Sequence, residues 1–317
     1  MKTKLTSINQ TSHIALDIET IPNRPLSEYD PSVQAYVNRK LAKAQAADHS
    51  MTYEKFASLH PSFGRIICLS WGCIAENTSG EQMALVQSYT GDEEDILQKF
   101  NRQFGNYPNV FVHYNGRSFA IPFILTRMRL RRIGCSNGNF ADLSQPRGWH
   151  HLDLMEFHAH HDPTKRLPLG VLAALTHLPS PKLDLDGSMV FDAFQDGEIR
   201  RIARYCEWDV ATVLNLLRSL VGGFDPIPPE RLYSIDVDGE WGYLASAQPN
   251  GSCPSVWDED KTVFISSDKI PQLGREAPGT HAGHDGAALA ESNELQPRAN
   301  GKITMADLRA ASRTQAS

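Results

Sequence analysis

The chain has 317 residues and a formal net charge of −6, with 41% hydrophobic and 21% charged residues, a composition that excludes wholesale disorder and a fibrous repeat. There is no run of about 18 apolar residues, the N-terminus lacks an apolar signal core, and the five cysteines are odd in number and scattered. We therefore expect no membrane span, no secretion and no disulfide scaffold, and a cytoplasmic location. Because nucleic-acid binding through an overall field usually needs a basic protein, any such site must be local.

The first 222 residues predict alternating strands and helices. Residues 13–21 alternate, with an apolar face and a face that carries Asp17 and Glu19. Four further strands are expected at 65–75, 83–89, 110–114 and 151–155. Helices are expected after the capping residue Asp92, at 121–132, at 169–178 and at 197–220, with a weakly patterned helical insertion at about 26–62. These elements predict an α/β fold with a mixed sheet flanked by helices.

The composition changes after residue 222. Residues 223–265 begin with glycines and prolines and form a short extension, in which 232–244 is compatible with a hairpin. Residues 266–317 contain no aromatic residue and are rich in Gly, Ala and Ser. Such a segment cannot bury enough apolar area to offset its ordering entropy, so we expect a largely disordered tail with one short helix near 305–311.

Asp17 and Glu19 are the first candidate functional residues. They are two apart on a predicted strand, so both carboxylates project from the same face. Adjacent carboxylates repel each other unless a positive charge lies between them, and a hard divalent cation with oxygen ligands meets that need. The alternative is a solvated strand face that carries two acids.

Tyr205 and Asp209 are four apart on the last long helix and flank its apolar stripe. A carboxylate there is costly unless it is paired or bound to a metal, and a phenol one turn away can orient or deprotonate a water. The alternative is an edge aromatic beside a surface acid.

A third candidate spans residues 114–122, Tyr-Asn-Gly-Arg-Ser-Phe-Ala-Ile-Pro, where a strand turns into a helix. Asn115 can hydrogen-bond a ligand or its own turn. Phe119 can stack on a base or pack in the core. A purely structural strand-to-helix turn is the alternative.

Taken together, Asp17-Ile-Glu19-Thr20, Asn115-Gly-Arg-Ser-Phe119 and Tyr205-x-x-x-Asp209 resemble, in order and spacing, the three exonuclease motifs of the DEDD superfamily. The Tyr-x-x-x-Asp form marks the DEDDy branch. The chain is most similar to the predicted 3′–5′ exonucleases related to the proofreading domain of B-family DNA polymerases. The resemblance covers about residues 10–222 and implies a ribonuclease H-like fold.

The resemblance also implies a mechanism and its residues. The reaction would use two divalent cations, Mg²⁺ or Mn²⁺, to release nucleotides from the 3′ end of single-stranded nucleic acid, with DNA favoured over RNA. Asp17, Glu19 and Asp209 would be the metal ligands, and Tyr205 would hold or activate the attacking water. The terminal nucleotide would be held by Thr20, Ile21, Asn115 and Phe119.

One position departs from the family pattern. An aspartate is expected directly after Phe119, where this chain has Ala120. Alanine cannot bind a metal, so we expect this chain to be inactive or strongly impaired. Either an Asp→Ala change was introduced or a natural member has degenerated; we favour the first because the rest of the motif is intact. The rival functions are a non-catalytic nucleic-acid-binding module and a scaffold whose tail recruits a protein partner.

Several basic clusters offer a local positive field for nucleic acid. Arg117, Arg201 and Arg204 are the best candidates for phosphate contact. The other clusters are Arg127, Arg129, Arg131 and Arg132; Lys165 and Arg166; and Arg200. An ordinary solvated helix face is the alternative for each. Five histidines between 150 and 161 match no common zinc spacing, so we do not assign a zinc site.

Overall fold

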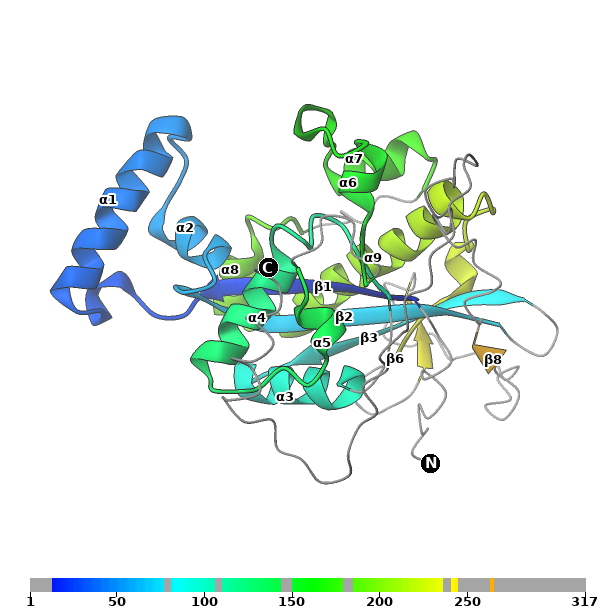
Figure 1. Cartoon of the computed structure of the whole chain (residues 1–317), viewed down its shortest axis with the longest axis horizontal. Helices are drawn as coiled ribbons and strands as arrows, with labels where there is room; N and C mark the ends of the chain where they lie inside the picture. Colours follow the sequence, from blue (N-terminus) through cyan, green and yellow to red (C-terminus); the bar gives the residue numbers. More distant parts are fainter. Residues whose placement is uncertain are drawn as a thin grey trace, which may run out of the picture. The chain divides into compact units, whose positions relative to one another are not determined.

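A computed structural model describes residues 13–76, 81–105, 110–143, 150–178, 185–235, 241–244 and 263–264. Its centre is one mixed sheet (Figure 1), in the order β5-β4-β1-β2-β3-β6-β7, with β8 paired to β2 outside this path. The strands are β1 (His13–Pro22), β2 (Gly64–Glu76), β3 (Gln82–Thr90), β4 (Val110–His113), β5 (His151–Asp153), β6 (Leu232–Ile235), β7 (Trp241–Tyr243) and β8 (Val263–Phe264). Strand β2 is antiparallel to β1 and β3, whereas β4 runs parallel to β1 and β5. The predicted mixed α/β sheet is confirmed.

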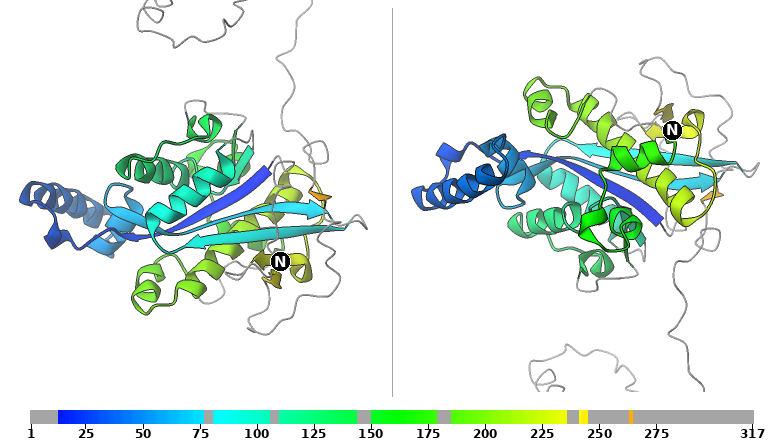
Figure 2. Two further views of the ribbon diagram at one scale, coloured as in Figure 1. Left: turned by 90° about the horizontal axis from the view of Figure 1, so that it is seen from below. Right: turned by 90° about the horizontal axis from the view of Figure 1, so that it is seen from above.

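Helices cover both faces of the sheet. The α-helices are α1 (Pro31–Ala47), α2 (Tyr53–Leu59), α3 (Glu93–Phe104), α4 (Ala120–Leu130), α5 (Gly138–Ala141), α6 (Leu154–His158), α7 (Leu169–Leu175), α8 (Val190–Gln195) and α9 (Ile199–Leu216). Figure 2 shows α3 and α4 on one face and α9 on the other. A π turn, Leu217–Val221, extends α9. None of the helices in the described ranges is both long enough and apolar enough to cross a membrane.

Strand β1 separates the two cores. Its even positions Ile14, Leu16 and Ile18 pack with the residues of α3 and α4, whereas Ala15 packs with residues of α9. This is the alternation of faces that the sequence predicts for residues 13–21. As a result, the odd-numbered acidic positions of β1 face α9.

Two expected elements end earlier than predicted. The strand expected at 151–155 stops at Asp153, because the Asp153 carboxylate accepts hydrogen bonds from the N–H groups of Met155 and Glu156 and thereby begins α6. The helix expected at 169–178 ends at Leu175, where the next residues turn and His177 adopts a positive φ. Asp92 caps α3 as expected.

The segment expected as a helical insertion contains α1 and α2. Val37, Ala57 and Phe63 form its small buried core. The Thr20 hydroxyl donates a hydrogen bond of 2.7 Å to the carbonyl of Ser58 and so joins α2 to β1. The segment therefore lies at the C-terminal end of β1 (Figure 1).

Strands β6 and β7 pair antiparallel within the segment expected as a hairpin, and β6 extends the sheet beside β3. Residues 236–240, 245–262 and 265 of the extension fall outside the described residues. The tail predicted at 266–317, with its short helix, also lies outside them.

Candidate active site

The two acidic residues of β1 meet α9. Asp17 is half-buried and Glu19 is 8% exposed. One carboxylate oxygen from each and the thiol sulfur of Cys206 on α9 all lie within 4.8 Å of one another. Sequence reasoning predicted the carboxylate pair but not Cys206, because a strand residue and a helix residue 189 positions apart share no local pattern.

Tyr205 and Asp209 complete this acidic cluster from α9. Burial raises the pKa of Tyr205 strongly, and the negative charges of Asp209, Glu19 and Asp17 raise it further. The Tyr205 phenol therefore stays protonated at neutral pH. Asp209 is itself buried, with 8% of its surface exposed. The structure thus brings together the four residues that the sequence predicts from the first and third motifs.

The carboxylates repel one another in this site. Burial raises the pKa of Asp17 to about 7. The pKa of Glu19 lies well above its ordinary range because of burial, and because the charges of Asp17 and Asp209 are close. Without a compensating positive charge, the cluster must hold protons that an exposed carboxylate would lose.

The acidic cluster fits a hard divalent cation. Within the described ranges, no lysine or arginine forms an ion pair with Asp17 or Glu19. Carboxylate oxygens are the ligands that Mg²⁺ and Mn²⁺ prefer. Cys206 matches this set less well, because burial and its contact with Cys68 raise its thiol pKa and keep the sulfur neutral.

The second motif forms a tight turn between β4 and α4. Asn115 has a left-handed backbone with φ of 61°, a conformation that asparagine tolerates better than most residues. A Cβ at Gly116 would lie 2.6 Å from the Cβ of His113, so this position requires glycine. Phe119 is half-buried and packs against Phe123 at a ring-centroid distance of 5.6 Å.

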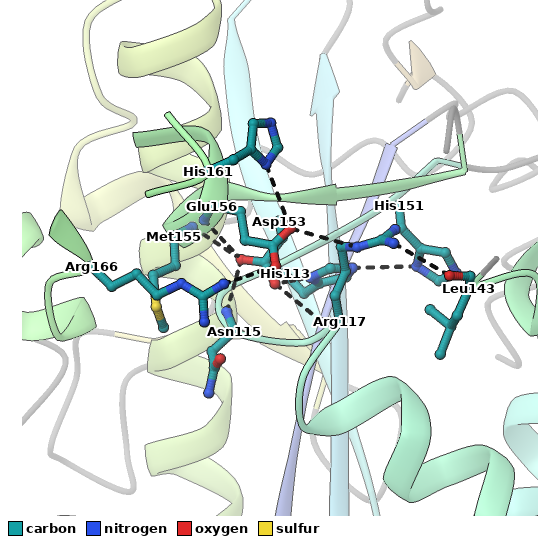
Figure 3. A network of polar contacts seen from close by, with 10 residues as sticks. All are labelled: His113, Asn115, Arg117, Leu143, His151, Asp153, Met155, Glu156, His161 and Arg166. Carbon is teal, nitrogen blue, oxygen red and sulfur yellow. Dashed lines mark hydrogen bonds and ion pairs between the residues drawn. The ribbon is translucent and has the colours of Figure 1, made fainter. Parts of the chain in front are cut away.

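Asp153, which sequence reasoning did not select, holds this turn (Figure 3). Its carboxylate accepts hydrogen bonds of 3.0 Å from the N–H of Asn115 and 3.1 Å from the N–H of Arg117. His113 lies 3.3 Å from the same carboxylate, and both side chains are 1% exposed. Burial alone would raise the pKa of Asp153, but His113 and the two N–H groups lower it below its usual value.

The contacts of His151 define its tautomer. The Nε2 atom of His151 lies 3.0 Å from the carbonyl of Phe140, which can only accept, so Nε2 carries the proton. Burial lowers the pKa of His151 to about 4, which leaves its Nδ1 as an acceptor for His113 Nε2 at 3.3 Å. His113 thus contacts His151 through Nε2, and its Nδ1 lies 3.3 Å from the Asp153 carboxylate. His151 is thus a buried structural histidine.

The arginines proposed for phosphate contact all have carboxylate partners. These pairs are Arg117 with Glu156 at 3.6 Å, Arg201 with Glu198, and Arg204 with Glu207 at 3.5 Å. Glu156 also binds Arg166 at 3.2 Å (Figure 3). Their positive charges are therefore partly compensated within the chain, which weakens the field that the sequence alone suggests.

The cluster predicted along α4 has a structural role at two positions. Arg127 is 4% exposed and donates two hydrogen bonds to Glu93, from Nε at 2.8 Å and from Nη2 at 2.7 Å. The same carboxylate accepts from the N–H of Ile66 at 2.8 Å and from Arg131 at 2.9 Å. Arg127 and Arg131 therefore join α4 to the start of α3, whereas Arg129 and Arg132 are exposed.

Ala120 is the first residue of α4 and is 2% exposed. It belongs to the core on the α4 face of the sheet. Of the remaining residues predicted to hold the terminal nucleotide, Thr20 is 8% exposed and Ile21 is 2% exposed. Their roles in binding stay predictions.

Comparison with known proteins places the chain in a family. No curated protein matches its sequence significantly. Among solved structures it is similar to the family B DNA polymerase from the hyperthermophilic archaeon Pyrobaculum calidifontis, with 16% sequence identity and a TM-score of 0.43. That match covers 66% of this chain, which spans only 24% of the polymerase chain.

A family model described as "Predicted 3′-5′ exonuclease related to the exonuclease domain of PolB" matches residues 56–221. The matched range contains the second and third motifs and begins after Asp17 and Glu19. More than half of the chain is covered. The chain therefore belongs to the family of predicted 3′–5′ exonucleases related to the exonuclease domain of PolB.

Proposed function

We propose that this fold carries out metal-dependent 3′–5′ exonucleolysis of single-stranded nucleic acid, with DNA favoured and RNA as a further substrate. The observation that carries the proposal is the convergence of Asp17, Glu19 and Asp209 with Tyr205 between β1 and α9. Membership of the exonuclease family supports it.

We assign Asp17, Glu19 and Asp209 as the ligands of two divalent cations, Mg²⁺ or Mn²⁺. Bound there, such cations supply charge stabilisation at the scissile phosphate and lower the pKa of a water. Tyr205 keeps its proton and donates a hydrogen bond, so its proposed task is to orient the attacking water and not to deprotonate it. The Asn115 turn and Phe119 position the terminal nucleotide.

Ala120 leaves this ligand set one carboxylate short, and we propose that the chain is inactive or strongly impaired for this reason. The test is a nuclease assay on the Ala120→Asp chain beside the unaltered chain, with 5′-labelled single-stranded DNA and RNA, Mg²⁺ or Mn²⁺, and chelator. The proposal expects a metal-dependent ladder that shortens from the 3′ end only after Ala120→Asp.

If the Ala120→Asp chain cleaves neither substrate with either metal, the exonuclease proposal fails for this chain. A non-catalytic nucleic-acid-binding module then takes its place, and it predicts binding that needs no metal. Ala120 itself is the observation that favours this second function, because binding requires no complete carboxylate set.

A further inference from the structure

A substrate strand with one phosphate charge per nucleotide needs positive charge along its path. The acidic cluster at β1 and α9 repels such a strand. The arginines predicted to contact phosphate, Arg117, Arg201 and Arg204, are each paired with a glutamate. Cations that lack such partners are therefore better suited to attract the strand.

Helix α1 carries cations of this kind. Its 17 residues contain Arg39, Lys40 and Lys43 and no acidic residue, although Asp30 and Asp48 flank its ends. All three cations are exposed, and in the described part of the chain none of them forms an ion pair. Helix α1 is thus an uncompensated positive segment in a chain with a net charge of −6.

An exposed aromatic ring lies within this segment. Tyr36 is 39% exposed, and Arg39 and Lys40 lie over its ring at 5.7 and 5.6 Å from the ring centroid. The spacing of Tyr36, Lys40 and Lys43 puts them along one side of the helix. Cations beside an exposed aromatic face are the combination that binds phosphates and stacks bases without reading sequence.

The placement of α1 connects this surface to the acidic cluster. Helix α2 is joined to Thr20 on β1 through the Ser58 carbonyl, one residue beyond Glu19. Helix α1 packs on α2 through the core around Val37 and Phe63 and extends beyond the end of the sheet, as both views of Figure 2 show. A strand whose 3′ end lies at Glu19 can therefore continue outwards towards α1.

We propose that Tyr36, Arg39, Lys40 and Lys43, the α1 surface, bind the single strand upstream of its 3′ end. This inference rests on the proposed function, because it takes the 3′ end to lie at the acidic cluster. It adds a second contact region, specific for single-stranded nucleic acid through phosphate charge and base stacking. The α1 surface would strengthen binding of the single strand, and the acidic cluster would carry out cleavage at its 3′ end.

The test measures binding of the full chain to fluorescein-labelled single-stranded DNA of about 20 nucleotides by anisotropy over a series of salt concentrations. The variant Arg39→Ala/Lys40→Ala/Lys43→Ala is compared with Lys99→Ala/Arg129→Ala/Arg132→Ala. The control triple removes the same charge from exposed positions on α3, on α4 and just after α4. Both triples leave buried residues unchanged, and circular dichroism checks that each is folded.

The α1 triple should weaken binding roughly ten-fold at about 0.1 M salt and reduce the slope of log K against log salt by about 2, as expected for three lost phosphate contacts on a single strand. The control triple should change the slope much less. Tyr36→Leu should weaken binding, and Tyr36→Phe, which keeps the ring, should not.

Equal binding by the α1 triple and the control triple overturns the inference, and so does a Tyr36→Leu chain that binds like the unaltered one. Cleavage by the Ala120→Asp chain reports on the proposed function separately. An Ala120→Asp chain that cleaves, combined with an α1 triple that binds normally, therefore refutes the α1 surface and leaves the exonuclease proposal standing.

Discussion

The Asp153 carboxylate accepts a hydrogen bond of 3.0 Å from the main-chain N–H of Asn115, across 38 positions of sequence. This contact joins the end of β5 to the turn of the second motif. Asn115 has a positive φ there, and a buried acceptor for its N–H stabilises that conformation. The position of the proposed substrate-binding turn thus depends on a residue outside all three motifs.

We expect Asp153→Asn to lower the free energy of unfolding by about 2 to 3 kcal/mol, because it removes a buried carboxylate oxygen that accepts from the main chain and changes the contact with the buried His113. Urea denaturation measures this. Asp162→Asn is the matched control, since Asp162 also accepts from a main-chain N–H at a helix start but near the surface, and its loss should cost less than that of Asp153. Equal losses for both would show that the His113 pair contributes nothing.

The same carboxylate should make the stability of the fold depend on pH in the acidic range. The pKa of Asp153 is lower in the folded chain than its ordinary 3.8, so its contribution is present above that value and is lost as the pH falls through the folded pKa. As the pH falls below about 4, the free energy of unfolding should therefore decrease less steeply for Asp153→Asn than for the unaltered chain.

Asp17 should give the opposite pH dependence. Its folded pKa of about 7 exceeds the ordinary 3.8, so the folded chain holds a proton that the unfolded chain has lost. The metal-free chain should lose stability as the pH rises from about 4 to about 7, and Asp17→Asn should reduce this loss. Mn²⁺ should raise the melting temperature more at pH 7.5 than at pH 5, since metal binding needs ionised carboxylates. A Mn²⁺ effect that is the same at both pH values contradicts the ligand assignment.

Tyr205→Phe, in the Ala120→Asp chain, should lower kcat by about 10²-fold with little change in folding, because the phenol would orient the water. Since the pKa of Tyr205 is raised, no basic limb from its ionisation should appear in the pH–rate profile below pH 10. Tyr53→Phe, which removes a hydrogen bond to the Arg24 carbonyl in the insertion, is the control and should leave kcat unchanged. A kcat unaffected by Tyr205→Phe removes the residue from the proposed mechanism.

Arg127→Ala should destabilise the fold by about 3 to 5 kcal/mol, because Glu93 would remain buried at 1% exposure with much of its positive partner lost. Arg129→Ala, on the same helix but exposed, should change stability by no more than about 0.5 kcal/mol. Thermal unfolding of the two variants measures the difference, and similar melting temperatures would refute a buried ion pair between α3 and α4.

Several features could be predicted from the sequence because their signals are local. The alternation of β1 placed Ile14, Leu16 and Ile18 on one face and put Asp17 and Glu19 on the other. The capping residue Asp92 marked the start of α3. The order of the three motifs was enough to predict the family, and the family match over residues 56–221 confirms this prediction.

The partners of buried charges could not be predicted, because they come from distant segments. Arg127 and Glu93 are 34 positions apart, and nothing in either neighbourhood distinguishes Arg127 from the exposed Arg129. Likewise, His151 belonged to a run of histidines with no assigned role until β5 paired with β4 and put it beside His113.

The sequence by itself determined the alternation of strands and helices and the three motifs, and it led us to expect an aspartate where the chain has Ala120. Each depends on residue type and short spacing, which act through backbone geometry within a few residues. Only the tertiary structure decided which charges neutralise one another, leaving Arg39, Lys40 and Lys43 without carboxylate partners in its described part. Electrostatic energy depends on distance through space, and the folding of the sheet sets that distance.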